Sequence, residues 1–517
     1  MDRDEPLFAQ ATKQMLESGD FVSIRFQDVA RNKKPAGIYW LQAASVTAAE
    51  WLGLDDARRS IWVYRLPSLL AATGSVLLVY WVALAFVARS NAFLAAALFS
   101  CVLLLGVEAR LAKTDAAVLA STLAGMGAFA RIYLKQGAAG SWSLPLIFWT
   151  SIGLGVLIKG PITPLVPFLA GIMLALSDRS APWLGALKPL PGLIWAALIV
   201  TPWFVLIMIA TEGQFLRDSL GNDLLAKLGS GQEGHGSPPL TYLAFFWVTA
   251  SPMAPLAVLA APFVWRERKD RGVRFLAAWL IPFWVLFECI ATKLPHYLLP
   301  VYPAVAILIA IAIEREAMNL DSRWRRTIPW IIPILTILSL VAPGAYGLWA
   351  KTPPGMAYWV FAPLAAGFSI CFAAGSRDYP TRVINTAAGA VCFYLATYSG
   401  LLTAPFGRKI AISPQLAASS SIDGCPDPEL ASAGYSEPSL VLLTRTDIAL
   451  VDGRGAAEFM NSGPCRIAFV EREEEASFKS VLDSQTGVVL RERISGFDIN
   501  SWRWLDIGVW VRERAIP

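Results

Sequence analysis

Charged side chains are scarce in this chain of 517 residues, because Asp, Glu, Lys and Arg together make up only 16% of it. The excess of positive charge is small, +5, and falls mostly in short segments between apolar runs, which does not indicate nucleic-acid binding. Only two histidines are present, whereas a zinc site needs three or four converging ligands. The polar C-terminal part contains neither a phosphate-binding glycine motif nor a nucleophile elbow, so we assign no chemistry to it.

Long apolar runs are abundant instead, and 55% of the residues are hydrophobic. The runs recur at about 17–25 residues, the length that an α-helix needs to cross a bilayer. They predict an all-α polytopic membrane bundle of about twelve spans. These lie near residues 61–87, 91–107, 116–134, 142–158, 162–177, 190–210, 240–263, 273–291, 297–313, 328–349, 357–374 and 383–402.

Basic residues in the short loops predict the orientation, because Lys and Arg are retained on the cytoplasmic side. They occupy alternate loops, at Arg89, Arg131 with Lys135, Arg179, residues 266–271, residues 323–326, and Arg377 with Arg382. Residues 1–60 and everything after about 403 are therefore expected on the periplasmic side of a bacterial inner membrane. With both ends outside, nothing carries residues 1–60 across, so we expect one further span to precede Met1.

Two regions outside the spans have their own character. Residues 1–60 form a periplasmic first loop, with interfacial helices expected over 5–20 and 35–51, before the membrane bundle of 61–403. Residues 404–517 predict a small α/β domain, for which a cap or a docking module is the default role. Its expected elements are strands at 439–444, 466–470 and 506–511 and helices at 455–461 and 473–483. Because this tail is predicted in an oxidising compartment, a disulfide between Cys425 and Cys465 is a candidate.

Two acidic clusters fall on the predicted periplasmic face. Asp4 and Glu5 open the first loop, where a carboxylate can act as a general base or stabilise positive charge on a sugar ring. The alternative is that they cap the following helix. The turn from Glu108 to Asp115 packs four charges, including Arg110, which is more than a plain turn needs. Asp115 starts a span, so its carboxylate can point into the bundle.

Basic residues share this face, and ammonium groups at a membrane surface are able to hold a phosphate. The candidates are Lys33, Lys34, Lys159 and Lys293, with His296 beside the last. For Lys33 and Lys34 the alternative is attraction to anionic lipid headgroups. For Lys159 it is snorkelling to the headgroups, and for Lys293 with His296 it is a structural turn. His235 lies in a long polar loop. Its imidazole could serve as a metal ligand, as an acid or base, or as a hydrogen-bond donor, and the sequence does not choose among these roles.

Together these blocks resemble a known family, the membrane glycosyltransferases of the GT-C class. Within it they are most similar to the bacterial lipid A aminoarabinose transferases and the protein O-mannosyltransferases. The similar stretches follow the family order over about 300 residues. They are DEPLFAQATKQMLESGDF at 4–21, KKPAGIYWLQA at 33–43, EARLAKTDA at 108–116, LIKGP at 157–161, TPWFVL at 201–206, HGSPPLTYL at 235–243 and KLPHYLLPVYP at 293–303.

The resemblance implies an enzyme that moves a sugar from a polyprenyl-phosphate carrier to an envelope acceptor at the periplasmic face. Lipid A or lipopolysaccharide core is the preferred acceptor, ahead of protein. The residues implied are Asp4 and Asp115 as catalytic acids, Lys34, Lys159 and Lys293 on the carrier phosphate, and His235 near a metal. Relatives of the aminoarabinose enzyme usually carry Glu where this chain has Lys33, and an ammonium cannot replace that ligand. No cofactor is therefore predicted with certainty, and a divalent metal at His235 stays an open alternative.

A transporter or flippase of lipid-linked sugars is the main alternative of another class, followed by a non-catalytic assembly subunit. Transporters place ionisable residues near the middle of the membrane on broken helices. In this chain the mid-span positions are nearly free of charge, and Glu288, close to a span end, is the nearest exception. The sequence therefore favours a transferase whose partners are a polyprenyl-linked sugar, a lipid acceptor and the surrounding membrane lipids, and not nucleic acid.

Overall fold

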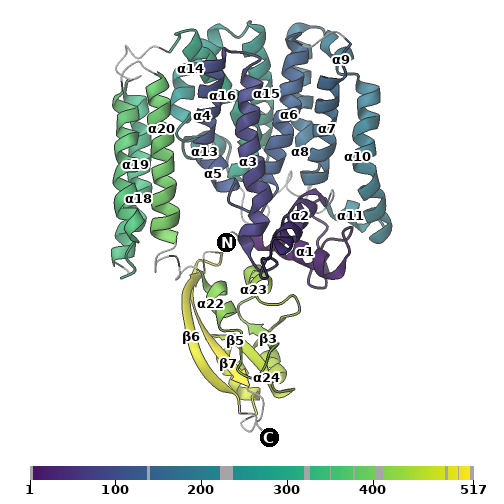
Figure 1. Cartoon of the computed structure of the whole chain (residues 1–517), viewed down its shortest axis with the longest axis vertical. Helices are drawn as coiled ribbons and strands as arrows, with labels where there is room; N and C mark the ends of the chain where they lie inside the picture. The colour runs from purple at the N-terminus through teal and green to yellow at the C-terminus, as the bar shows by residue number, and fades with distance from the viewer. Residues whose placement is uncertain are drawn as a thin grey trace.

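The apolar runs form helices that lie alongside one another, and a small region with strands extends from one end of this bundle (Figure 1). This computed structural model describes residues 4–136, 140–219, 221, 237–318, 326–349, 351–375, 379–402, 407, 411–483, 487–498 and 500–512. The helices of the first half are α1 Glu5–Ser18, α2 Gly37–Trp51, α3 Ile61–Ala83, α4 Arg89–Ser100, α5 Leu103–Glu108, α6 Asp115–Tyr133, α7 Ser143–Lys159, α8 Ile162–Asp178, α9 Pro182–Ala186, α10 Pro189–Ala210 and α11 Gln214–Leu216.

The second half of the bundle continues in the same way. Its helices are α13 Thr241–Thr249, α14 Ala254–Arg266, α15 Arg271–Cys289, the 3-10 helix η3 Pro295–Val301, α16 Tyr302–Glu314, the 3-10 turn η4 Ile328–Trp330, α18 Ile331–Trp349, α19 Met356–Ala374, α20 Tyr379–Tyr394 and the π-helical segment η5 Leu395–Leu402. In Figure 1, α18, α19 and α20 stand as a group beside the rest of the bundle, while α1 and α2 lie at the end that faces the C-terminal strands.

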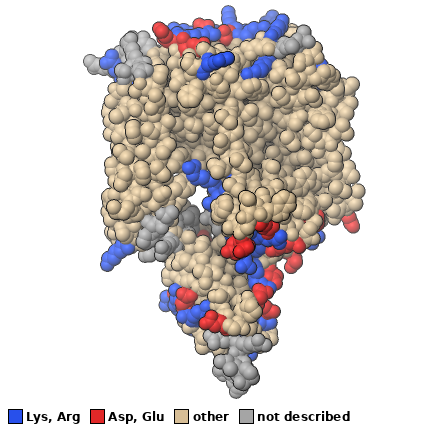
Figure 2. Space-filling model, viewed as in Figure 1, with Lys and Arg blue, Asp and Glu red and all other residues tan. Residues whose placement is uncertain are grey.

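Seven helical segments within the described residues are long and apolar enough to cross a membrane, so this is a multi-pass membrane protein. They are Ile61–Ala83, Asp115–Tyr133, Pro189–Ala210, Arg271–Cys289, Pro295–Glu314, Ile328–Trp349 and Met356–Ala374. Figure 2 agrees, because a broad belt without charged side chains separates the two charged ends of the bundle.

The expected number of about twelve spans is not confirmed, and broken helices explain part of the difference. The run at 91–107 is divided between α4 and α5, where Val102 has an extended backbone. The run at 240–263 is divided between α13 and α14 around Pro252, which has no N–H to continue a helix. Two other apolar helices, α7 and α8, have only 17 residues each.

The C-terminal region contains a five-stranded mixed sheet in the order β4-β3-β5-β7-β6. β3 pairs in parallel with β4 and β5, whereas β7 is antiparallel to both β5 and β6. Its elements are α22 Ile412–Ala418, β3 Glu429–Ala433, α23 Pro438–Leu443, β4 Ala449–Val451, α24 Gly453–Asn461, β5 Arg466–Glu471, α25 Glu475–Val481, β6 Val489–Asp498 and β7 Arg503–Arg512. The structure joins Cys425 and Cys465 in a disulfide, which ties the segment before β3 to the start of β5.

The predicted strands at 466–470 and 506–511 and both predicted helices of this region are confirmed. The strand predicted at 439–444 is wrong, because these residues form helix α23. Pro438 occupies the first turn of α23, where its fixed φ favours a helix and its missing N–H costs nothing. The apolar alternation of a short run cannot distinguish these two structures without such a start signal.

Helix α23 and the loop after it dock the C-terminal region onto the first loop. Leu442 is fully buried in a cluster with Ala9 of α1, Val46 of α2 and Tyr64 of α3. Gln10 of α1 donates a hydrogen bond to the Thr446 hydroxyl at 2.8 Å. The C-terminal region therefore packs directly on the helix that begins beside Asp4.

Lys13 of α1 is buried in this interface, and burial lowers the pKa of its ammonium to about 8. Below pH 8 the folded and unfolded chains both hold the proton, so the cost of burying the charge is present in full. Between pH 8 and 10.5 only the unfolded chain holds it, so stability rises with pH. We expect Lys13→Met to raise the melting temperature at pH 7 by roughly 2–4 °C, with the difference from the wild type shrinking toward pH 10.

The matched control is Lys479→Met in α25. Lys479 also pairs with a carboxylate one turn away, at 3.7 Å from Glu475, but its side chain is 55% exposed. Melting followed by tryptophan fluorescence at pH 7 and pH 9.5 should show no change for this control. An equal shift in both variants would contradict the assignment of the effect to the buried charge of Lys13.

Candidate active site

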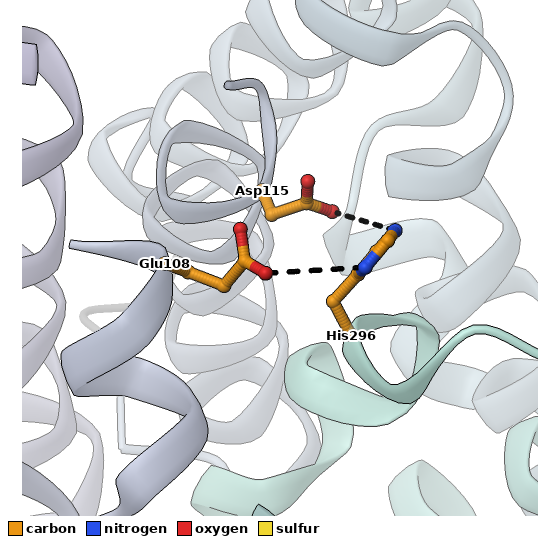
Figure 3. A group of neighbouring side chains, drawn as sticks. All are labelled: Glu108, Asp115 and His296. Carbon is orange, nitrogen blue, oxygen red and sulfur yellow. Dashed lines mark ion pairs between the residues drawn. The ribbon is translucent and has the colours of Figure 1, made fainter. Parts of the chain in front are cut away.

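A charged cluster lies where α5, α6, α7 and η3 meet (Figure 3). Asp115 is the first residue of α6, where the helix dipole favours a carboxylate. Lys159 is the last residue of α7, and its Nζ lies 2.5 Å from Asp115 Oδ1. Both side chains are almost fully buried. Two ends of neighbouring helices thus bring together residues that are 44 positions apart in the chain.

The imidazole of His296 lies between two carboxylates in Figure 3. Its Nδ1 is 3.9 Å from Glu108 Oε1, and its Nε2 is 3.9 Å from Asp115 Oδ1. Lys113 Nζ lies 3.8 Å from Glu108 Oε1. The cluster therefore contains two acids, two ammonium groups and one imidazole, all held at helix ends or turns at the same end of the bundle.

The ligand atoms of Glu108, Asp115 and His296 lie within 4.8 Å of one another, a grouping that is able to hold a metal ion. Each carboxylate, however, already faces an ammonium group, Lys113 or Lys159. A divalent cation would have to displace or neutralise both lysines. The two ammonium groups therefore already neutralise the two carboxylates, and a divalent metal at this triad would have to compete with both lysines.

A cavity of about 470 Å³ lies beside the cluster. Its polar lining includes Lys33, Lys34, Asp115, Lys159 and His296. The rest of its wall is mainly apolar, with Phe204, Phe215, Leu216, Leu286, Phe287 and Ile290 among the lining residues. A pocket with three ammonium groups on apolar walls has the chemistry to hold an amphiphile with an anionic head.

Close packing of two helices brings the lysine pair to this cavity. Gly37, at the start of α2, packs against the backbone of α7, and a Cβ there would lie 2.7 Å from the carbonyl oxygen of Leu157. Only glycine permits that approach without displacing the backbone. Lys33 and Lys34 precede Gly37 by three or four residues, so this contact places them near Lys159.

The other acidic candidates lie elsewhere. Asp4 is exposed at the N-cap of α1, and within the described residues its side chain makes no capping hydrogen bond. Glu5 is fully buried. Its carboxylate accepts two hydrogen bonds from Arg65, at 2.6 and 2.8 Å, and one from the backbone N–H of Ala112 at 3.0 Å. Glu5 therefore anchors α1 to α3 and to the 109–114 turn, which holds the backbone of Asp4 beside that turn.

Among the basic candidates, Lys293 is buried and donates to the carbonyls of Ile290, at 2.7 Å, and Ser237, at 3.2 Å. It is not among the described residues that line the cavity. Arg110 stacks on the ring of Tyr394, with its Cζ 4.4 Å from the ring centroid. His235, the residue for which a metal was considered, lies outside the described residues.

Known proteins give matching comparisons. The protein family described as dolichyl-phosphate-mannose-protein mannosyltransferase matches residues 33–206. An undecaprenyl phosphate-alpha-4-amino-4-deoxy-L-arabinose arabinosyl transferase of Erwinia tasmaniensis is 30% identical over 314 residues, or 59% of this chain and 54% of that protein. The enzyme of the same name from Pectobacterium carotovorum is 27% identical over 350 residues, which is 67% of this chain and 61% of that protein.

The fold is similar as well. The crystal structure of ArnT from Cupriavidus metallidurans bound to undecaprenyl phosphate superposes with a TM-score of 0.73 at 18% identity, covering 98% of this chain and 93% of that one. The resemblance to the GT-C glycosyltransferases of the aminoarabinose transferase family is confirmed. The matched part of the chain spans only 54–61% of the length of the two curated relatives. The low identity of the structural match means that it shows a shared fold alone.

Arg65 is a residue near this candidate site that the sequence patterns did not single out. It lies in the fifth position of α3, within a run predicted to cross the membrane. A charged residue inside a span is costly unless it is paired, and that signal pointed to a buried partner. The partner is Glu5, 60 positions earlier.

Replacing Glu5 with Ala is expected to destabilise the protein by about 3–5 kcal/mol, because it leaves the charge of Arg65 without its buried partner. The melting temperature of the purified protein measures this effect. The control is Glu50→Ala, since Glu50 also pairs with an arginine, Arg58 at 2.6 Å, but both side chains are partly exposed. An unchanged melting temperature in the Glu5 variant would contradict the anchoring role.

Proposed function

We propose that the protein is a glycosyltransferase that moves a sugar from a polyprenyl-phosphate carrier to an envelope acceptor. Lipid A or lipopolysaccharide core is the preferred acceptor, and the reaction takes place at the periplasmic face of a bacterial inner membrane. The observation that carries the proposal is the cavity of about 470 Å³, with Lys33, Lys34 and Lys159 on otherwise apolar walls. A prenyl phosphate has the same division into an anionic head and a long apolar tail.

In the proposed reaction, the bond between the sugar C1 and the phosphate oxygen breaks, and the acceptor oxygen forms the new bond to C1. Lys34 and Lys159 stabilise the negative charge that grows on the departing phosphate. Asp115 holds the Lys159 ammonium in place through the 2.5 Å contact. Asp4 takes the proton of a hydroxyl acceptor, or orients a phosphate acceptor and stabilises the oxocarbenium-like sugar.

The proposed orientation is supported by the opposite end of the bundle. The basic loops expected in the cytoplasm meet there, since Arg271 donates to the carbonyl of Tyr133 at 2.6 Å and Arg274 pairs with Asp178. Tyr133 ends the same helix, α6, that begins with Asp115. The charged cluster and the arginine-rich loops are thus at opposite ends of one membrane-spanning helix, as the positive-inside rule requires of a periplasmic site.

The test uses the purified full chain in lipid nanodiscs, supplied with a radiolabelled undecaprenyl-phosphate aminoarabinose and lipid A. We expect label to appear in lipid A, with a matching mass increase by mass spectrometry. Lys34→Met should abolish most of this transfer, because one phosphate contact is lost from the cavity. Lys188→Met is the control, since Lys188 is likewise a lysine beside a helix start but precedes α10 at the other end of the bundle, where it lies over the ring of Trp142. Movement of intact donor across the membrane without transfer would favour a flippase instead.

A further inference from the structure

A second cavity, of about 410 Å³, lies between the group α18, α19 and α20 and the rest of the bundle. Its walls are mainly apolar and include Leu103, Ile332, Phe372, Gly389 and Phe393. Tyr394 also lines it and donates a hydrogen bond to the carbonyl of Leu103 at 3.2 Å. Ile332 and Phe372 belong to helical segments that are long and apolar enough to cross the membrane, so the cavity suits an acyl chain more than a water-soluble ligand.

Arg110 lies at the Tyr394 end of this cavity. Its guanidinium stacks on Tyr394, at 4.4 Å, and on Tyr398, at 4.8 Å, and donates to the carbonyl of Gly106 at 2.7 Å. Among the residues that the structure describes, no carboxylate pairs with Arg110. The other charged residues of the same turn differ, since both acids face lysines. Within the described part of the chain, Arg110 is thus a cation without a carboxylate counter-charge.

The surface agrees with this placement. Figure 2 shows basic side chains at the edge of a hollow that separates the α18–α20 side from the rest of the bundle. The guanidinium of Arg65, which also acts electrostatically on Tyr398, is 32% exposed, but Glu5 balances its charge. A positive charge at the membrane level is costly unless an anion compensates it. The phosphate of a membrane lipid is the anion available to Arg110 at this level.

We propose that this second cavity is the acceptor site, in which a phosphate-bearing acyl lipid places one chain in the cavity and its phosphate on Arg110. The inference rests on the proposed transferase function and assigns the acceptor to a part of the structure separate from the donor cavity. Arg110 stacks on Tyr394 of the second cavity, whereas Asp115 lines the first. Arg110 and Asp115 are five residues apart, so their Cα atoms are separated by at most about 18 Å. A glycolipid headgroup held at Arg110 therefore lies within reach of a sugar held beside Asp115.

Arginine suits this role for geometric reasons. Its planar guanidinium offers parallel donors to a phosphate while its face stays stacked on the tyrosines. The stacking holds the side chain in one orientation before the lipid arrives, so less conformational entropy is lost on binding. Lysine keeps the charge but not the stacking. The Arg110→Lys variant is therefore expected to bind the phosphate-bearing lipid less tightly than the wild type and more tightly than the Arg110→Gln variant.

The test measures binding, apart from any transfer. The full chain in phosphatidylcholine nanodiscs is titrated with bisphosphorylated lipid A, with its dephosphorylated form and with inorganic phosphate. Arg110→Gln should weaken lipid A binding by about 10- to 100-fold, as expected for loss of a charge-assisted hydrogen bond, and leave undecaprenyl phosphate binding unchanged. Arg131→Gln is the matched control, because Arg131 makes the same bond to a carbonyl one turn back and stacks on Trp81, but at the other end of α6.

Binding of the acyl chain is tested by filling the second cavity with a larger side chain. Ala390 lines it, so Ala390→Trp should weaken lipid A binding at least as much as Arg110→Gln does. Gly367→Trp is the control, since Gly367 is in α19 with open space around it. Equal affinity for dephosphorylated lipid A, equal affinity for inorganic phosphate, or wild-type binding in Arg110→Gln would each overturn the proposal. Normal lipid A binding dependent on Arg110, but no sugar transfer, would refute the transferase function and leave this site standing.

Discussion

Asp4→Asn is expected to lower the rate of sugar transfer by about 10²- to 10⁴-fold, the range lost with a general base. The amide has the same shape as the carboxylate but cannot take the acceptor proton. Because the Asp4 side chain makes no capping hydrogen bond to α1, the fold should not be affected. The measurements are the turnover number for labelled sugar and the melting temperature, with only the first expected to change.

The control for this variant is Asp20→Asn. Asp20 belongs to the same first loop, near the other end of α1, and accepts hydrogen bonds from the N–H groups of Val22 and Ser23. An asparagine oxygen preserves these bonds, so transfer should stay near the wild-type rate. Near-normal transfer by the Asp4 variant would remove Asp4 from the mechanism and leave Glu108 and Asp115 as the acids of the described cluster.

Lys159→Met is expected to abolish detectable transfer and to destabilise the fold by about 3 kcal/mol. Removing one partner of a buried pair leaves the carboxylate of Asp115 uncompensated, which typically costs about 3–5 kcal/mol. Donor binding should weaken as well, because Lys159 lines the cavity beside Lys34.

The double variant Lys159→Met with Asp115→Asn separates structure from chemistry. It removes both charges, so we expect the melting temperature to return toward that of the wild type while transfer stays absent. Recovery of transfer together with stability would mean that the pair serves folding alone. Binding of undecaprenyl phosphate to each variant, measured in nanodiscs, supplies the second readout.

The sequence predicted much of this fold because a membrane span is recognised from the length and apolar content of its own segment. The run at 116–134 needed only its length and apolar content to be recognised, and it forms α6. Prediction failed where the decision depended on neighbours or on single backbone positions. The run at 91–107 breaks at Val102, and Leu103 then donates its N–H to the carbonyl of Ser251, a partner far away in the chain.

The candidate site shows the same division. Charge in the turn of residues 108–115 was visible in the sequence, and so were the isolated lysines, because charges beside apolar runs are rare. Their partners were not visible. Glu5, considered with Asp4 as one acidic motif, is bound to Arg65 instead, whereas Asp4 is exposed. Adjacent residues on a helix point in different directions, so two neighbours in sequence come to serve different purposes.

By itself, the sequence determined that this is a membrane bundle with a soluble C-terminal part and a charged face, since hydropathy and charge are properties of each segment alone. Only the tertiary structure decided which charges meet. The pairing of Lys159 with Asp115 depends on how the end of α7 packs on the start of α6. The stacking of Arg110 on Tyr394, 284 positions later in the chain, depends on where α20 packs beside the turn after α5. Such contacts join distant segments, and their geometry comes from the packing of whole helices.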